Sequence, residues 1–236
     1  MMKINVVCSL KDPVGQTVKS LGYAVEALDE EPISFRYEKG DAVIMICRHS
    51  SAAGVDSVTV HHPGNPTNST YGGEPFTLGI SFPSLASEIL RRLKKLDIPL
   101  QKTFEATHHG PTSQRVPVIF VELGSSERIW RNEKYVKSVV DCVLATLDEK
   151  QEKQVAVGFG GGHYAPSFTK MVEELNIGHI ISKHQLAESP PQVLKQAVEK
   201  SVERAHKVLL DNVNSTIKSK IEQALSELEV EIKRIS

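Results

Sequence analysis

The sequence has few cysteines and no long apolar run. Its 236 residues include three cysteines, Cys8, Cys47 and Cys142, which are far apart and lie in apolar segments. This excludes a disulfide framework or a Cys-x-x-Cys metal site and indicates buried free thiols in a reducing compartment. No segment approaches the roughly 20 apolar residues that cross a bilayer, and residues 1–10 lack a signal-peptide layout. We therefore expect a cytoplasmic protein without a membrane partner.

The sequence also lacks a strong net charge. Its formal charge is −1 at pH 7, which gives no global attraction to nucleic acid. Basic residues nevertheless cluster in two places, Arg91, Arg92, Lys94 and Lys95, and then Arg128, Arg131, Lys134 and Lys137. Such clusters are more often solvated helix faces than binding surfaces, so a local basic face is the less favoured alternative.

The pattern of apolar residues predicts one α/β domain over residues 1–236. Short runs rich in Val and Ile predict strands at 3–9, 41–47, 55–61, 103–107, 116–123, 154–157, 177–181 and 207–211, with an edge strand near 228–232. Helical spacing predicts helices from Pro83, after Gly124, from the glycine run through Leu175, from Pro191 to about Ala205, and over 214–225. This alternation is typical of a mixed, mostly parallel sheet flanked by helices, and it makes the first third strand-rich.

Two loops combine glycine, proline and histidine. They are residues 105–112, EATHHGPT, and residues 158–166, GFGGGHYAP, each beside a predicted strand. Glycine lets backbone approach a ligand, proline restricts the loop, and histidine can bind metal or transfer protons near neutral pH. A purely structural loop does not need histidine, so both loops are candidate parts of an active site. The polar stretch 63–73 is a third candidate loop.

Several standard enzyme motifs are missing. A GxGxxG match from Gly158 fails at His163, and no Walker lysine follows. Anion binding by Gly160–Gly162 remains an alternative to a simple tight turn. There is no HExxH helix, and Ser50 and Ser51 lie in no GxSxG elbow, so a turn-capping role is favoured for them.

The remaining histidines form a set with two carboxylates near predicted strand ends. The pairs are His61-His62 and His108-His109, joined by His49, His163, Glu105 and Glu122. Adjacent side chains on a strand point to opposite faces, so one of each pair faces a common site unless the backbone bends, as Pro63-Gly64 and Gly110-Pro111 allow. Imidazole and carboxylate are zinc ligands. A single histidine is more often structural, but the set favours a functional site.

These motifs resemble those of the archaeal and plant type of D-aminoacyl-tRNA deacylase. The resemblance covers most of residues 41–181 and is carried by Arg48-His-Ser-Ser51, His61, Gly64-Asn65, Tyr71-Gly-Gly73, residues 105–112, Glu122 with Gly124-Ser-Ser-Glu127, residues 160–166, and Gly178-His-Ile180. It implies a fold like the peptidyl-tRNA hydrolase and phosphorylase-like α/β folds. It also implies hydrolysis of the ester between a D-amino acid and tRNA, with zinc as the cofactor.

From this resemblance we expect three sets of site residues. The expected metal ligands, for one or two zinc ions, are His49, His61, His108, Glu122 and His163. The expected catalytic residues are Glu105 as general base, His108, His109 and His163. The expected substrate-binding residues are Arg48, Asn65, Thr112, Gly160, Gly161, Gly162 and Tyr164.

The expected partner is tRNA charged with a D-amino acid, with no DNA, and the chain is expected to be a monomer. Two alternatives stay open at this point. One is another hydrolase on the same scaffold, either a peptidyl-tRNA hydrolase or a zinc aminopeptidase. The other is a tRNA-binding protein without catalytic activity.

Overall fold

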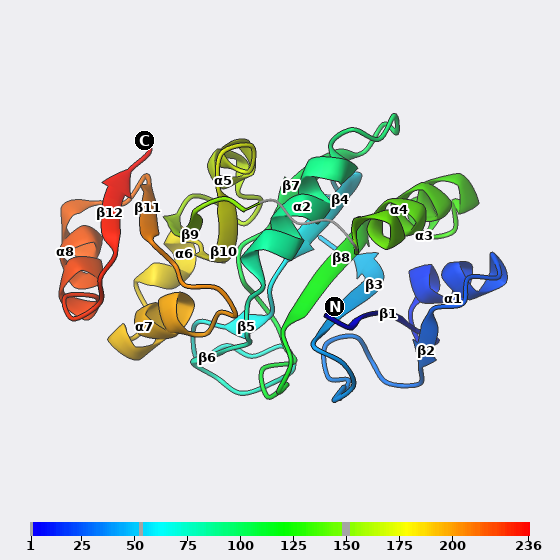
Figure 1. Ribbon diagram of the computed structural model, residues 1–236, viewed down its shortest axis with the longest axis horizontal. Helices are drawn as coiled ribbons and strands as arrows, with labels where there is room; N and C mark the ends of the chain where they lie inside the picture. Colours follow the sequence, from blue (N-terminus) through cyan, green and yellow to red (C-terminus); the bar gives the residue numbers. More distant parts are fainter. Residues whose placement is uncertain (1, 52–53, 148–151) are drawn as a thin grey trace.

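A computed structural model describes residues 2–51, 54–147 and 152–236 and arranges their strands in two main sheets (Figure 1). The six-stranded sheet, on the right in Figure 1, has the order β2 (Glu26–Leu28), β1 (Ile4–Ser9), β3 (Ala42–His49), β8 (Val118–Gly124), β4 (Ser57–His61), β7 (Gln101–Phe104). The four-stranded sheet, on the left, has the order β10 (Asn176–Ile181), β9 (Val155–Gly160), β11 (Lys207–Asp211), β12 (Glu231–Arg234). A short antiparallel pair is formed by β5 (Gly64–Asn65) and β6 (Thr77–Leu78).

Within the two main sheets, every described pairing is parallel except that of β4 with β8. The predicted mixed, mostly parallel α/β architecture is therefore confirmed. Its division into two sheets was not predicted, because hydrophobic periodicity locates strands but does not reveal their partners.

The helices differ from the prediction mainly at their ends. They are α1 (Pro13–Ser20), α2 (Pro83–Leu93), α3 (Glu127–Trp130), α4 (Glu133–Thr146), α5 (Pro166–Met171), α6 (Lys183–Leu186), α7 (Pro191–Glu199) and α8 (Ser215–Ala224). The predicted helix after Gly124 is two helices, because the Asn132 side chain caps α4 by accepting from the Tyr135 amide at 3.1 Å. The helices predicted to reach Leu175 and Ala205 end earlier, at Met171 and Glu199.

Helix α1 was missed, so the prediction of a strand-rich first third is incomplete. The signal for α1 is Asp12-Pro13. The Asp12 carboxylate accepts hydrogen bonds from the amides of Val14 and Gly15, and Pro13 occupies the first helical position. No described helix is long and apolar enough to span a membrane.

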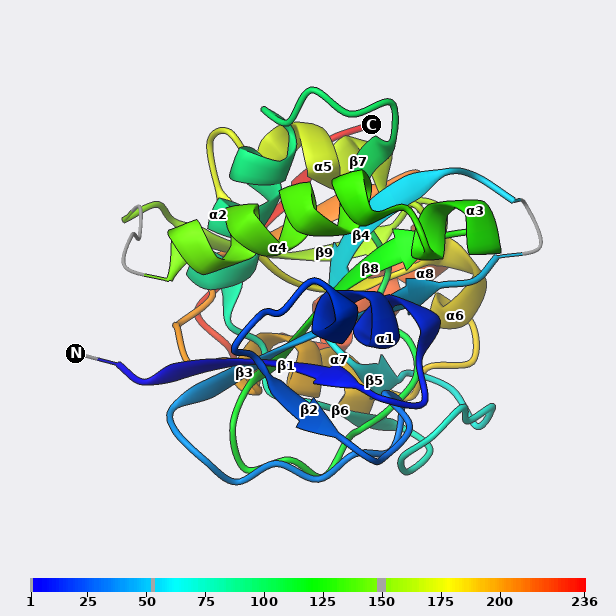
Figure 2. The ribbon, with the colours of Figure 1, turned by 90° about the vertical axis from the view of Figure 1, so that its right-hand side faces the viewer.

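The six-stranded sheet has two different faces. Helices α1, α2 and α4 cover one face and pack on residues such as Ile44, Ile46 and Val121. Figure 2 shows these helices above β1 and β3, with the loops after β2 and β5 gathered below. The second face carries a smaller buried cluster that includes Met45 and Phe120. Side chains alternate along strands, so polar residues two positions from Phe120 along β8 also lie on this second, loop-covered face.

The two basic clusters are largely paired with carboxylates. Arg91 is buried, and its guanidinium bonds to the carbonyl of Val172 and to Asn176. The other pairs are Arg92–Glu88, Lys94–Glu173, Arg128–Asp56, Arg131–Glu127 and Lys137–Asp141. These contacts indicate that both clusters stabilise the fold or form solvated helix surfaces, and they argue against a free basic face.

Two buried histidines, His62 and His179 of β10, lie side by side, with 5.6 Å between their ring centroids. His62 Nε2 accepts from the Phe82 amide at 3.1 Å, and His179 lies 2.9 Å from Thr107 Oγ1 and 3.1 Å from the Gly79 carbonyl. Burial lowers the pKa of His62 to about 4 and that of His179 to about 3. Both side chains are therefore neutral in the folded protein at neutral pH.

We expect these two histidines to make folding acid-sensitive. The unfolded chain takes up a proton on each near pH 6.5, whereas the folded chain does not until about pH 4 or 3, so acid favours unfolding. The free energy of unfolding should be unaffected above pH 6.5 and should fall by about 2 kcal/mol per histidine at pH 5. Urea unfolding at pH 7.5 and pH 5 measures this.

The matched control is exposed His206. His179→Gln should reduce the loss of stability between pH 7.5 and pH 5, whereas His206→Gln should leave it unchanged. Equal unfolding midpoints for the wild type at the two pH values would contradict the assignment.

Candidate active site

The predicted histidines and carboxylates meet on the loop-covered face of the six-stranded sheet. Strand register places them there: Glu122 in β8 lies opposite Cys47 in β3 and Thr59 in β4. His49 follows two residues after Cys47, and His61 two residues after Thr59, so both share the face of Glu122. Glu105, directly after β7, joins them from the far side of β4.

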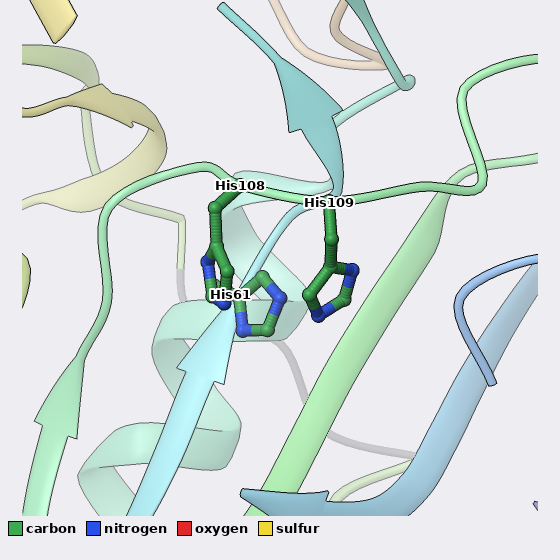
Figure 3. A group of neighbouring side chains, drawn as sticks. All are labelled: His61, His108 and His109. Atoms are coloured by element: carbon green, nitrogen blue, oxygen red, sulfur yellow. The ribbon is translucent and has the colours of Figure 1, made fainter. Parts of the chain in front are cut away.

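Three histidines bring their rings together at the centre of this face (Figure 3). His61 comes from the end of β4, and His108 and His109 come from the loop after β7. The ring centroid of His61 lies 4.3 Å from that of His108 and 4.8 Å from that of His109. His61 also stacks on Phe120, at 5.1 Å between centroids.

The two histidine pairs behave differently. His61 and His62 follow the rule for a strand and point to opposite sides. His108 and His109 both reach the centre, because His109 adopts a left-handed backbone conformation with φ of 45°. The amide of Gly64 donates to the His109 carbonyl at 2.7 Å and holds this bend in place.

Backbone carbonyls select the tautomers of His108 and His109. Nδ1 of His108 lies 2.8 Å from the Ala106 carbonyl, and Nδ1 of His109 lies 2.7 Å from the Gly110 carbonyl. A carbonyl oxygen only accepts, so each Nδ1 carries a proton, and neutral His108 then presents a lone pair at Nε2. This arrangement is typical of histidines that bind a metal through Nε2.

The two buried carboxylates lie among the imidazoles. Glu122 Oε1 is 3.3 Å from His109 Nε2, and its Oε2 is 3.3 Å from His49 Nδ1. Glu105 Oε1 is 3.1 Å from His163 Nε2 and 3.3 Å from His49 Nδ1, and its Oε2 is 3.5 Å from His61 Nδ1.

The surroundings decide which of these groups carry charge. Burial opposes ionisation of Glu105 and Glu122, but their histidine neighbours outweigh it and lower the pKa of both carboxyls. Burial also opposes protonation of His49, yet Glu122 and Glu105 raise its pKa. Burial lowers the pKa of His61 well below its usual value and that of His108 to about 4. The site therefore combines ionised carboxylates with neutral imidazoles at His61 and His108, the forms in which these groups bind metal.

Unpaired polar atoms show that the site fits a cation. Both ring nitrogens of His61 and both carboxylate oxygens of Glu105 are buried and lack a hydrogen-bond partner among the described residues. The ligand atoms of His61, His108 and His109 all lie within 4.8 Å of one another. In two further groups the ligand atoms also lie within 4.8 Å of one another. One group is Glu105, His108 and His163, and the other is His49, Glu105 and Glu122. Ligands of one zinc ion lie roughly 3.3 to 3.5 Å apart, so small movements would bring these atoms to zinc distances.

The other predicted residues surround this centre in different ways. The Tyr164 hydroxyl lies 2.8 Å from His49 Nε2. Arg48 is partly exposed and lies over the Trp130 ring at 5.6 Å. Gly160 ends β9 and Gly161 and Gly162 follow it; the Gly161 amide donates to the Asp211 carbonyl at 2.9 Å and is not free for an anion. The proposed role of this glycine loop in substrate binding stays a prediction.

Asn65 and Thr112 use their side chains to hold the loop 71–74. Asn65 Nδ2 donates to the carbonyls of Gly72 and Glu74, at 2.6 and 3.1 Å, and Thr112 Oγ1 accepts from the Glu74 amide at 2.8 Å. Both side chains are buried. Their predicted substrate contact is not visible in these bonds, but the loop that they hold borders the site.

Two cavities open onto the histidine centre. The first, of about 250 Å³, is lined by Asp12, Glu31, Pro32, Ile33, Cys47, Arg48, His49, Ser50, Tyr71, His108, His109 and Glu122. The second, of about 300 Å³, is lined by Gly64, Asn65, Pro66, Thr67, Ser69, Tyr71, His108, His109 and Gln185. Tyr71 and the two histidines border both cavities.

Asp12 is a cavity residue that sequence reasoning missed. Its Oδ1 also accepts from the Arg48 amide at 3.1 Å, so the carboxylate joins the start of α1 to the end of β3. Burial raises the pKa of Asp12 to about 6, although three backbone hydrogen bonds oppose the shift. The Asp-Pro signal at the start of α1 could have located the helix, but not the cavity.

The fold and the site define an α/β enzyme with a buried histidine–carboxylate centre. The D-aminoacyl-tRNA deacylase family model matches residues 36–233. A D-aminoacyl-tRNA deacylase of Sulfurisphaera tokodaii is 45% identical over 235 residues, which are 98% of this chain and 99% of the relative. One of Saccharolobus solfataricus is 46% identical over 230 residues, covering 96% of this chain and 97% of the relative.

A solved structure agrees with these relatives. The crystal structure of the conserved protein of unknown function AF0625 superposes with a TM-score of 0.89 at 28% identity and covers 99% of this chain and 95% of that chain. The chain belongs to the D-aminoacyl-tRNA deacylase family, whose members are hydrolases acting on ester bonds. The family inferred from the sequence motifs is confirmed.

Proposed function

We propose that this centre hydrolyses the ester bond between a D-amino acid and tRNA and releases free tRNA and the D-amino acid. Family membership supports the reaction. One structural observation supports the location of the active site. That observation is a set of buried ligand atoms that make no hydrogen bond among the described residues, both nitrogens of His61 and both oxygens of Glu105, beside two cavities. Such unpaired buried groups are costly and are typical of sites that bind a ligand.

Zinc is the proposed cofactor, with His61, His108 and His109 as its protein ligands and Glu122 beside them. The Ala106 carbonyl contact leaves Nε2 of neutral His108 unprotonated, and Glu122 Oε1 lies 3.3 Å from His109 Nε2, a distance at which both could hold one ion. When bound, zinc lowers the pKa of a coordinated water to about 7 and polarises a carbonyl. His49 and His163 lie instead beside Glu105, where a second ion could bind.

Glu105 is the proposed general base. Its ionised carboxylate is fully buried among the histidine rings of the centre, where it can accept the proton of the attacking water. His163 Nε2, 3.1 Å from Glu105, is 45% exposed at its side chain and can pass that proton to solvent. His49 lies between the two carboxylates, with its Nδ1 3.3 Å from Glu122 and 3.3 Å from Glu105, and these neighbours raise its pKa.

The proposed partner is tRNA carrying a D-amino acid, and the chain is proposed to act as a cytoplasmic monomer. Free cysteines support a reducing compartment, and the exposed large apolar residues, such as Leu144 and Val202, are few among the described residues. No contact in the site favours a peptidyl-tRNA hydrolase or aminopeptidase over this family. The histidine centre also argues against a purely tRNA-binding role, because binding RNA does not require buried unpaired imidazoles.

Removal of metal should abolish activity and zinc should restore it. Treatment with a chelator is expected to lower the rate of D-Tyr-tRNA hydrolysis by at least about 100-fold, because the neutral imidazoles cannot themselves polarise the ester. Zinc add-back should restore the rate, and elemental analysis should find one or two zinc ions per chain. A metal-free enzyme that keeps full activity would contradict the zinc proposal but leave the deacylase reaction standing.

A further inference from the structure

Tyr71 is an exposed aromatic residue at the junction of the two cavities. Its side chain is among the few large apolar ones on the described surface, at 69% exposure. Its ring makes no aromatic or cation–π contact, and its hydroxyl makes no hydrogen bond, with the described residues. Packing within the fold therefore does not explain why this ring stands here.

The backbone around Tyr71 is held rigidly. The Tyr71 carbonyl accepts from the Gly110 amide at 2.9 Å, and buried Asn65 and Thr112 hold Gly72 and Glu74 as described above. Gly72 and Gly73 have positive φ angles of 72° and 69°. A Cβ on Gly72 would come within 2.2 Å of the Ile33 carbonyl oxygen, so the loop packs backbone against backbone. The fold thus fixes the position of the Tyr71 ring, although this ring makes no ring contact with the described residues.

The two cavities differ in chemistry on either side of this ring. The first contains His49 and Glu122 of the catalytic centre together with apolar Pro32 and Ile33. The second is lined by amides and hydroxyls, including Thr67 and Ser69. Among the described residues, only His108, His109 and Tyr71 border both.

An aminoacyl ester of tRNA also has two unlike parts joined at the reacting bond. If the ester lies at His108 and His109, the amino acid extends into one cavity and the terminal adenosine into the other. The acidic and apolar first cavity suits the amino acid, and the second suits the hydroxyls of a ribose. The adenine ring beyond that ribose then meets Tyr71.

The geometry points to Tyr71 as the stacking platform for the terminal adenine of the tRNA substrate. This inference rests on the proposed function and adds a binding residue for the nucleoside to it. Stacking of a base on an exposed aromatic side chain is favourable and independent of the rest of the tRNA, because it uses only the π-face of the base. Asn65 and Thr112 act through the loop, as positioning residues for Tyr71.

Substrates with and without adenine test the inference. We expect Tyr71→Ala to lower kcat/KM by about 10- to 100-fold for D-Tyr-tRNA and for 3′-O-D-tyrosyl-adenosine, but to leave hydrolysis of D-tyrosine methyl ester within about threefold of wild type. Tyr71→Phe keeps the ring and should remain near wild type on all three. The control is Phe76→Ala, which removes another exposed aromatic residue that borders neither cavity.

Binding of AMP measures the contact between adenine and Tyr71 without hydrolysis. AMP should bind wild type and Tyr71→Phe alike, and Tyr71→Ala about 10- to 100-fold more weakly. An equal loss by Tyr71→Ala on the methyl ester, or unchanged AMP binding, would overturn the inference. A wild-type protein that binds AMP through Tyr71 but does not hydrolyse D-Tyr-tRNA would refute the proposed reaction and still support the adenine site.

Discussion

Glu105→Gln is expected to hydrolyse D-Tyr-tRNA about 10²- to 10⁴-fold more slowly than wild type, with the loss in kcat. The amide has nearly the shape of the carboxylate but cannot accept the proton of the attacking water. Glu105 also contacts His49, His61 and His163 at 3.1 to 3.5 Å, and the neutral amide weakens these ion pairs, so the unfolding temperature is measured on the same preparation. Single-turnover deacylation measures the chemical step directly.

A carboxylate outside the site provides the control for this variant. Glu74 is exposed and its side chain takes no part in the histidine centre, so Glu74→Gln should retain wild-type kcat. A Glu105→Gln variant with near-normal kcat would remove Glu105 from the mechanism. Its role as general base would then pass to a histidine such as His163.

His108→Ala is expected to lose both zinc and activity. His108 is the only histidine that belongs to two of the three candidate ligand groups found among the described residues, so its removal disrupts both. We expect zinc content to fall by at least one ion per chain and kcat/KM to fall on the order of 10³-fold. Elemental analysis and deacylation of D-Tyr-tRNA, run on the same preparation, test the two losses together.

The matched variant is His184→Ala. His184 is exposed and lies outside the ligand groups, so this variant should keep its zinc and its rate. Because neutral His108 donates to the Ala106 carbonyl, His108→Asn offers a second variant that retains a donor there but lacks an imidazole lone pair. Full zinc content in both His108 variants would show that the metal binds elsewhere or not at all.

The sequence predicted which residues form the site better than it predicted the role of each residue. His49, His61, Glu105 and Glu122 could be placed near strand ends from residue spacing, but their shared face follows from the strand register of the fold. That both His108 and His109 reach the centre depends on one left-handed residue, which spacing does not reveal. The family motifs identified His108 and His109 as site residues but did not reveal the backbone conformation at His109.

Other features depend on contacts between segments distant in sequence. Asn65 and Thr112 lie in the recognised motifs, but their bonds to the loop 71–74 appear only after folding. Asp12 lies outside the recognised motifs and joins the cavity through the packing of α1 against β3. The division into two sheets likewise follows from strand pairing across the chain rather than from local periodicity.

The most direct test of this account compares hydrolysis of D-Tyr-tRNA and L-Tyr-tRNA by the same enzyme preparation. We predict that the D-ester is hydrolysed faster by roughly 100-fold or more, the discrimination that a shaped pocket can supply. Equal loss of both esters would contradict D-specificity and leave a general aminoacyl esterase. Loss of neither ester, with zinc present, would contradict the proposed function itself.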